Sequence, residues 1–420
     1  MRIGVAGGGI AGLTLAWLLE GSHEVLLLEE RDRLGGNADS VLTTENGLPR
    51  VVDLGVRETP VEASPVWQHV GASVGLSAEH LVPVTTSRVV SDHRERSALW
   101  VSPAEPADKA RRVTTDGPAY QAMLRLARES SRWEAEGMSW DVTLGDVLDA
   151  WALRGSLAER LLCALPAALH GTTVREARDL SARAVGAAFS RPDRAARTTY
   201  LRWGTGSLVQ ALAAGARSAT VRVNAALRVV RRAGDGFELV RESGDVDQVD
   251  AVALALPADR ARSVLGGLPG AEAWKDALGA VEYREVTYVL HRDPYGMPED
   301  RNVWSTANIT LDGSWSETTT WYGPSLGLDL FVSRLDHRSG RPREELARSS
   351  FRATLPTPRA CRARRTLGAV GAGQRLLFLG HCTTPVETQE AAMTSALVAA
   401  HHLAPRSERV RRLRHYLQGG

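Results

Sequence analysis

The chain has 420 residues, of which 43% are hydrophobic and 24% charged, with a formal net charge of +2. This composition predicts one large or two ordinary domains with hydrophobic cores, and the near-neutral charge argues against nucleic acid or an anionic membrane as a partner. No apolar run reaches the roughly 18 residues of a membrane-spanning helix. The three cysteines lack C-x-x-C and metal-ligand spacing, so no metal is expected and the reducing cytoplasm is the expected compartment.

The first forty residues carry the clearest functional pattern. A buried strand is predicted over residues 2–6, an apolar helix over 13–19 and a second strand over 25–28. Between the first strand and the helix, residues 7–12 read GGGIAG and match G-x-G-x-x-G. The order strand, glycine turn, helix, strand and then the acidic Glu29 is that of a dinucleotide-binding unit.

Each part of this unit has a physical task. Gly7 permits a tight turn, Gly9 lets the backbone approach a pyrophosphate, and Gly12 lets helix and strand pack closely. The helix N-terminus offers N–H groups and partial positive charge to phosphates, and a carboxylate at position 29 can accept ribose hydrogen bonds. The candidate cofactor-binding residues of this unit are Gly7, Gly9, Ile10, Ala11, Gly12 and Glu29.

The following residues indicate which dinucleotide is bound. Residues 29–37, EERDRLGGN, resemble the E-x-R-x-R-x-G-G stretch of FAD enzymes in the monoamine oxidase and phytoene desaturase superfamily. The resemblance implies FAD as cofactor, and it adds to the expected FAD contacts the residues Glu30, Arg31, Gly35, Gly36 and Asn37.

Three further stretches match the same superfamily. Residues 53–55 form a D-x-G that brings the chain under the flavin, so the resemblance implies contacts from Gly55 and Val56. Residues 221–227 resemble the strand of these enzymes that contacts the adenine, and the resemblance implies that Leu227 makes this contact. After the last strand at residues 376–379, the resemblance implies flavin contacts from Gly380, His381, Thr388 and Gln389.

The flavin motifs define the expected domain organisation. They recur in residues 1–56, 200–262 and 366–405, which are expected to form an FAD-binding domain; residues 57–199 and 263–365 are expected to form a substrate domain, and 406–420 a basic C-terminal surface tail. The fold class expected is α/β, with a Rossmann-type FAD-binding domain built from discontinuous segments and an α+β substrate domain.

Three helices are expected within residues 57–199, the first insert. One covers 119–133, and a second begins after a capping box at Thr143. The third covers 157–165, and Pro166 should end or kink it. Residues 103–108 should form a loop.

Residues 291–308 resemble a pattern, L-H-x-D, M-P and W-x-S-x-N, of the amine-oxidase-like FAD proteins that accompany cyclopropane fatty acid synthases. Among the departures from the monoamine oxidases, one concerns the catalytic lysine and one the attachment of the flavin. The strand expected at 283–288 lacks their lysine, and Cys382 lies earlier than the cysteine that binds flavin covalently, so noncovalent FAD is expected.

The expected chemistry is hydride transfer to FAD from a C–N or C–C bond of an apolar or aromatic small molecule, by an oxidase, dehydrogenase or desaturase of secondary metabolism. A redox-neutral isomerase or mutase, or a non-catalytic flavoprotein partner, are the alternatives. Catalytic candidates are Arg57, His291 and Tyr322, and candidates for a substrate wall are Trp304, Trp315 and Trp321. For each of these the competing interpretation is an ordinary core or surface residue. The oligomeric state is open.

Overall fold

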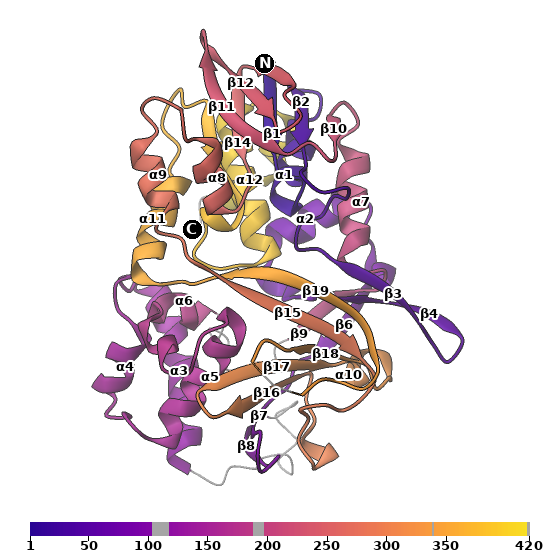
Figure 1. Cartoon of the computed structure of the whole chain (residues 1–420), viewed down its shortest axis with the longest axis vertical. Coiled ribbons are helices and arrows are strands. Elements are labelled where there is room, and N and C mark those ends of the chain that lie inside the picture. The colour runs from indigo at the N-terminus through magenta and orange to yellow at the C-terminus, as the bar shows by residue number, and fades with distance from the viewer. Residues whose placement is uncertain (103–116, 188–196, 338–339, 418–420) are drawn as a thin grey trace.

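A computed structural model describes residues 1–102, 117–187, 197–337 and 340–417 (Figure 1). Its upper half contains a five-stranded parallel sheet in the order β10-β2-β1-β14-β20. The strands are β1 (Arg2–Ala6), β2 (Glu24–Leu28), β10 (Thr220–Arg222), β14 (Ala251–Leu254) and β20 (Leu376–Phe378). Three distant segments of the chain thus form one dinucleotide-type sheet, which confirms the expected α/β fold.

Helices cover one face of this sheet and a small sheet with more helices covers the other. On the first face lie α1 (Ile10–Leu19), α2 (Pro65–Ser73), α7 (Thr205–Gly215) and α12 (Gln389–Leu403). On the second face lie β11 (Leu227–Ala233), β12 (Gly236–Arg241), β13 (Val246–Val249), α8 (Ala258–Val264), α9 (Glu272–Leu278) and α11 (Pro358–Gly368). Nine of the ten residues of α1 are buried, because this helix is apolar on all sides and lies between the sheet and α12.

The lower half is built on a seven-stranded sheet in the order β19-β15-β18-β17-β16-β7-β8. Its strands are β7 (Arg88–Asp92), β8 (Ala98–Val101), β15 (Tyr283–His291), β16 (Ala307–Asp312), β17 (Trp315–Trp321), β18 (Phe331–Arg334) and β19 (Glu345–Thr354). A parallel pairing of β7 with β16 joins the first insert to the second. The helices α3 (Gly117–Ala135), α4 (Leu144–Ala150), α5 (Leu157–His170) and α6 (Ala182–Ala187) pack into one core beside this sheet.

Short strands connect the two halves. A hairpin of β3 (Ser40–Glu45) and β4 (Leu48–Asp53) leaves the upper half, and β9 (Arg197–Leu201) pairs with both β5 (Glu58–Thr59) and β6 (Leu81–Thr85). The domain boundaries remain a prediction. Helices α2 and α9 come after the expected boundaries at residues 56 and 262 and would belong to the substrate domain, yet both pack against the upper half. No helix among the described residues has the length and apolar character needed to cross a membrane.

The structure differs from the sequence-based predictions on two local points: the helix does not end at Pro166, and the basic C-terminal segment is docked on the core. The helix α5 runs through Pro166 and ends at His170, where Gly171 adopts a left-handed conformation with φ 74°. Its last turn is held from outside, because Arg334 Nη1 donates hydrogen bonds to the carbonyl oxygens of Ala167 and Ala168. Because proline has no backbone N–H, the helix lacks one hydrogen bond at Pro166, and the packing of the final turn stabilises the helix in spite of this loss. The loop expected at 103–108 lies outside the described residues.

The basic C-terminal segment is not a free tail in residues 406–417. Helix α13 (Glu408–Leu413) buries Val410 and Leu413 completely in the core around α1. Arg409 Nη1 also donates a hydrogen bond to the carbonyl oxygen of Trp17, near the end of α1. The arginines dominate the composition of this segment, but its apolar residues Val410 and Leu413, at i, i+3 spacing, face the core, and Tyr416 and Leu417 pack against the same core.

Candidate active site

A cleft of about 450 Å³ is lined by residues of both halves of the molecule. Much of the predicted FAD set lies around it. The lining residues that the sequence predicted are Gly7, Gly9, Ile10, Ala11, Glu29, Glu30, Arg31, Gly35, Gly36, Asn37, Val56, Gly380, His381 and Gln389. The structure therefore brings the first glycine turn, the second glycine pair and the start of α12 to one cavity.

The two outer motif glycines and the central one are needed for different reasons. A Cβ on Gly12 would lie 2.0 Å from the carbonyl oxygen of Gly7, and a Cβ on Gly7 would lie 2.3 Å from that of Ala255. A Cβ on Gly9 would meet only the Cα of Gly36, at 3.9 Å. Gly9 is therefore not required by protein packing. It keeps open a space at the N-terminus of α1, which fits a diphosphate group.

Glu29 is fixed at the end of β2 by two backbone groups. Its Oε2 accepts the N–H of Gly8 at 2.7 Å and its Oε1 accepts the N–H of Arg31 at 2.9 Å. The side chain is 6% exposed and lies on the cleft. This carboxylate links the two glycine-rich turns and presents its remaining lone pairs to the cleft.

Replacing Glu29 with alanine is expected to weaken FAD binding by roughly 1.5–3 kcal/mol, because a charged hydrogen-bond acceptor is lost. The reaction catalysed by the remaining holoenzyme should be the same. Titration of apoprotein with FAD, followed by flavin fluorescence, measures the change. The variant Glu24→Ala is the matched control, since Glu24 begins the same strand, is exposed, does not line the cleft and forms a surface ion pair with Arg2 at 2.9 Å. Equal FAD affinities for wild type and Glu29→Ala would contradict the ribose role.

Four predicted cofactor residues do not line the cleft. Gly12 packs against the turn. Gly55 passes so close to Asn37 that a Cβ would lie 1.8 Å from the Asn37 carbonyl oxygen. Leu227 is buried in the core of the small upper sheet. Thr388 caps α12, with its hydroxyl accepting the N–H of Ala391 at 3.0 Å. Direct cofactor contacts from these residues stay predictions, and each has a visible structural task.

Arg57 lies next to the cleft residue Val56, within a group of tyrosines. Its guanidinium lies 4.6 Å from the centroid of the Tyr288 ring, and its Nη1 donates a hydrogen bond to the Leu54 carbonyl oxygen at 3.0 Å. Tyr200 and Tyr322 pack with ring centroids 5.5 Å apart. Burial raises the pKa of Tyr322, so its hydroxyl stays protonated. Neither Arg57 nor Tyr322 is among the residues that line the cleft, and their catalytic roles stay predictions.

The structure places the remaining candidates in the lower sheet. His291 is fully buried, with Nδ1 2.8 Å from the Asp293 carbonyl oxygen and Nε2 2.8 Å from Ser333 Oγ. Trp304 packs edge-on against Trp321 at 5.3 Å, and Trp315 stacks on His337. The lining of the cleft includes none of His291 and these three tryptophans. The geometry thus gives these four residues a packing role, and a catalytic or substrate role stays a prediction.

Sequence reasoning missed the wall that the second insert supplies. The cleft is also lined by Tyr283, Glu285, Ser350, Phe351 and Arg352, which lie on β15 and β19. No motif marks these positions, because they meet the nucleotide-binding turns only through tertiary packing. Glu387 and Cys382, from the loop between β20 and α12, also line the cleft, and their closeness to His381 in sequence could have indicated them.

Cys382 bears on how the flavin is attached. The side chain is 1% exposed, its Sγ lies 3.2 Å from the Leu379 carbonyl oxygen, and burial raises the pKa of this thiol to about 12. A thiol that stays protonated is a poor nucleophile. Heat or acid should therefore release all flavin into the supernatant, where absorbance measures it. Flavin left on the denatured pellet would refute noncovalent binding.

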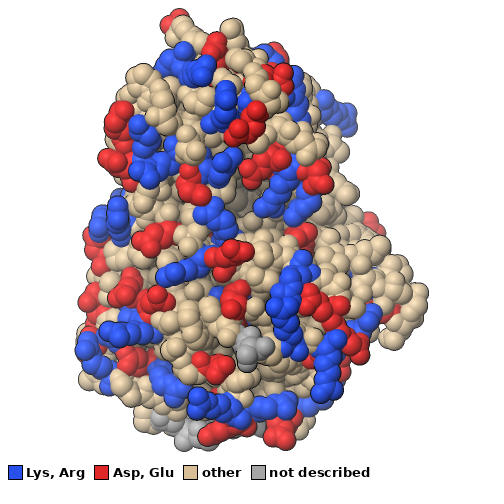
Figure 2. All heavy atoms as spheres, in the orientation of Figure 1, with Lys and Arg blue, Asp and Glu red and all other residues tan. Residues whose placement is uncertain are grey.

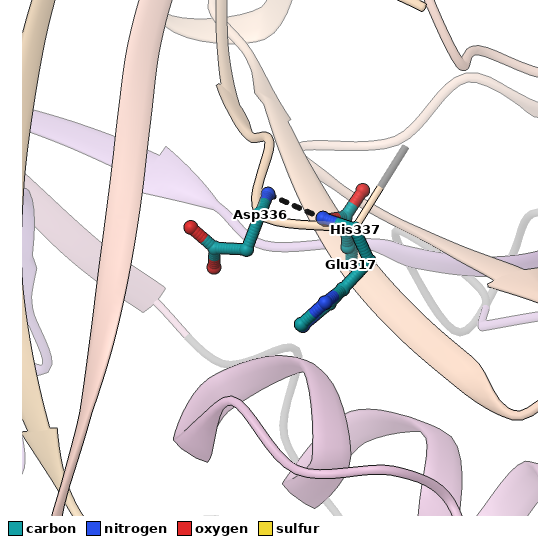
Figure 3. A group of neighbouring side chains, drawn as sticks. All are labelled: Glu317, Asp336 and His337. Carbon is teal, nitrogen blue, oxygen red and sulfur yellow. Dashed lines mark hydrogen bonds between the residues drawn. The ribbon is translucent and has the colours of Figure 1, made fainter. Parts of the chain in front are cut away.

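One cluster in the lower sheet has the residue types of a metal site. Glu317, Asp336 and His337 lie together (Figure 3), and Glu317 accepts the N–H groups of Asp336 at 2.8 Å and His337 at 2.9 Å. One possible ligand atom from each of the three side chains lies within 4.8 Å of the others. The buried Arg334 forms an ion pair with Asp336, so a cation already balances this carboxylate. The cluster is accounted for by hydrogen bonds and charge pairing within the fold.

Charge is mixed over the surface. Figure 2 shows basic and acidic side chains interspersed on the face that contains both halves of the molecule. Ion pairs such as Arg352 with Asp259, at 2.9 Å, and Arg301 with Asp329, at 2.8 Å, account for part of this pattern. Exposed pairs of this kind contribute little to stability.

Comparison with known proteins agrees with this site. Residues 10–306 match the family model described as flavin containing amine oxidoreductase. No curated protein sequence matches significantly. Among solved structures, the chain is similar to a candidate protoporphyrinogen oxidase from Exiguobacterium sp. 255-15, with 19% identity, TM-score 0.62 and coverage of 96% of this chain and 98% of the other.

Two more solved structures show the same fold. A redesigned putrescine oxidase has 14% identity and TM-score 0.66, with coverage of 97% and 100% of the two chains. A fatty acid isomerase from P. acnes has 13% identity and TM-score 0.65, with coverage of 94% and 97%. At these identities the similarity shows the fold alone, whereas the family model spans well over half of the chain. The protein therefore belongs to the flavin-containing amine oxidoreductases and is an FAD-dependent oxidoreductase.

Proposed function

We propose that the enzyme takes a hydride from a C–N or C–C bond of an apolar or aromatic small molecule, bound in the cleft beside the flavin. The observation that carries this proposal is the composition of the cleft. Its walls include the apolar side chains of Val56, Leu256, Phe351 and Leu379, and they continue from the nucleotide-binding turns to strands β15 and β19 of the lower half. A mostly apolar cavity with a few polar groups is typical of a small-molecule site.

The residues of this chain supply binding, orientation and exclusion of water. FAD, when bound, supplies the hydride acceptor. The N-terminus of α1 and Glu29 would hold the nucleotide end. Phe351 and Tyr283 would cover the other end, where removal of water strengthens electrostatic interactions.

Proton transfer, if the substrate needs it, requires a titratable group at the cleft. The described strand β15, Tyr283–His291, contains no lysine, so the lysine of monoamine oxidases has no counterpart on it. His381 and Glu387 both line the cleft, with His381 Nδ1 3.8 Å from Glu387 Oε1. We propose this pair as the proton-handling groups, with Arg57 as the candidate from the first insert.

Anaerobic mixing of the yellow holoenzyme with a panel of compounds tests the proposal. The panel contains an aromatic primary amine, an aliphatic primary amine, an aliphatic secondary amine and a long-chain fatty acid. Loss of flavin absorbance with one class, and its return on admission of oxygen or a dye acceptor, is the expected result. The variant Gly9→Val, expected to lack FAD, is the control for non-flavin chemistry.

Two other outcomes would contradict the proposal. Conversion of a compound to an isomer without lasting flavin reduction would indicate redox-neutral chemistry, the alternative that the fold similarity to the P. acnes isomerase brings forward. Neither bleaching nor conversion, with FAD bound, would favour a non-catalytic flavoprotein.

A further inference from the structure

Arg364 is a fully buried cation with no acidic partner in the part of the chain that the structure describes. It lies on α11, its side chain has 0% exposure, and its Nη1 donates a hydrogen bond to the Pro385 carbonyl oxygen at 3.2 Å. Its Nε and Nη2 have no hydrogen-bond partner among the described residues, and no described carboxylate lies within ion-pair distance of it. A buried charge left in this state is costly to the fold, and so it calls for an explanation.

The guanidinium lies near residues of the cleft wall, because its hydrogen-bond acceptor Pro385 lies two residues from the lining residue Glu387. Its positive charge acts on Tyr283 and Cys382, and both of these residues line the cleft. Pro385, which accepts its hydrogen bond, belongs to the loop that leads from β20 to α12. The same loop carries Glu387, and Gln389 begins α12. Arg364 therefore adds a positive charge at one end of the cleft. The N-terminus of the 15-residue helix α12 adds partial positive charge at the same end.

Reduction of the flavin brings negative charge into this region. A hydride carries one proton and two electrons, so a neutral ring that accepts it gains one negative charge. The substrate loses the same hydride. In a cleft shielded from water, a fixed cation nearby favours the charged reduced ring over the neutral oxidised one.

We propose that Arg364 is a positioning residue that stabilises the negative charge of the reduced flavin through the cleft wall, and so raises the reduction potential of the bound cofactor. The inference rests on the proposed place of the flavin ring at this end of the cleft. It explains why a cation stays buried without a carboxylate: its counter-charge comes with the reduced cofactor.

Glu387 should act in the opposite direction. Its Oε1 accepts the N–H of Thr354 at 3.1 Å and lies 3.8 Å from His381, so the carboxylate is held at the cleft without pairing with Arg364. Its negative charge opposes charge build-up on the flavin. Arg364 on α11 and Glu387 on the loop before α12 therefore predict shifts of opposite sign in the flavin potential.

The test uses the FAD-loaded full chain and needs no substrate. The midpoint potential is measured by equilibration with redox dyes, and sulfite affinity is measured from the flavin spectrum, because sulfite adds to flavin only where negative charge on the ring is stabilised. Arg364→Met should lower the potential and weaken sulfite binding roughly tenfold, for loss of one nearby charge at an intermediate effective dielectric constant. Arg364→Lys should restore most of both, and Glu387→Gln should shift the potential upward.

Arg362→Met is the matched control, because Arg362 lies on the same helix with a 58% exposed side chain paired with Asp141. It should leave both readouts unchanged. Denaturation of the apoprotein distinguishes the proposed electrostatic role from a purely structural one. Under the proposed role, Arg364→Met should be as stable as wild type or more so, since an unpaired buried charge is replaced by an apolar side chain of similar length. A structural arginine would make the variant less stable.

An unchanged potential and sulfite affinity in folded, FAD-loaded Arg364→Met would overturn the inference. So would an equal shift in Arg364→Lys, which would show that the hydrogen bond to Pro385 matters and the charge does not. Failure of the proposed function looks different, because it would appear as absence of substrate-dependent bleaching in a wild-type protein whose flavin potential still responds to Arg364.

Discussion

Replacing Gly9 with valine is expected to abolish FAD binding while the protein stays folded. A Cβ at this position would meet only the Gly36 Cα, at 3.9 Å, which is an ordinary van der Waals contact, so the Cβ itself clashes with nothing. The backbone angle φ at Gly9 is −77°, which any residue can adopt. The added side chain would instead fill the space in front of the α1 N-terminus, where the pyrophosphate is expected to bind.

The purified variant should be colourless and should show no binding in a titration with FAD. Its circular dichroism and unfolding midpoint should match those of wild-type apoprotein. Gly267→Val is the control, since nothing lies within 4 Å of a Cβ there and the position is away from the cleft. A folded Gly9→Val protein with one FAD per chain would show that the first glycine turn does not bind the cofactor.

Replacing Asp53 with alanine is expected to cause the largest loss of stability among the polar residues that support the site. Asp53 is 4% exposed, and it joins the end of β4 to the start of α7. Its carboxylate accepts the Thr205 N–H at 3.0 Å, the Thr205 hydroxyl at 2.7 Å and the Ser40 hydroxyl. Alanine would leave these buried donors unsatisfied, at a cost of about 1–3 kcal/mol each, and would remove a negative charge from the α7 N-terminus.

Urea denaturation of the apoprotein measures this loss. Asp245→Ala is the control, because Asp245 is 57% exposed in its pair with Arg241 and exposed pairs contribute little. If Asp53→Ala unfolds at the same urea concentration as wild type, the link between β4 and α7 is not important for stability.

The pH dependence gives a second readout for Asp53. Burial raises the pKa of this carboxyl group, and the hydrogen bonds from Ser40 and Thr205 offset only part of the effect. The folded protein therefore keeps this proton at pH values where the unfolded chain has lost it. Its contribution to stability is largest below the unfolded-state pKa of roughly 3.9 and falls as the pH rises through the folded-state pKa. Asp53→Asn should remove this pH-dependent part.

The sequence predicted the nucleotide half of the molecule in detail because its constraints are local. Gly7, Gly12 and Glu29 act within one continuous unit of strand, turn, helix and strand, where spacing alone places each residue. The capping box at Thr143 is confirmed for the same reason: Thr143 and Asp146 exchange hydrogen bonds within one helical turn.

The substrate side was predicted only as a class of structure. Aromatic residues at strand spacing correctly indicated a sheet, but spacing in a strand does not say which cavity a face will meet. Trp304 and His291 lie in the packed interior of that sheet. Tyr283 and Phe351, which carry no motif, reach the cleft because β15 and β19 cross beneath the upper sheet (Figure 1).

The sequence by itself determined the cofactor, the superfamily and the first unit of strand, glycine turn, helix and strand, since each depends on motifs within a short continuous stretch of the chain. Only the tertiary structure decided that α5 continues past Pro166, that Val410 docks the C-terminal segment, and that Arg364 is buried near the cleft with no acid among the described residues. These three outcomes depend on contacts between segments far apart in sequence, whose free energies override local propensity.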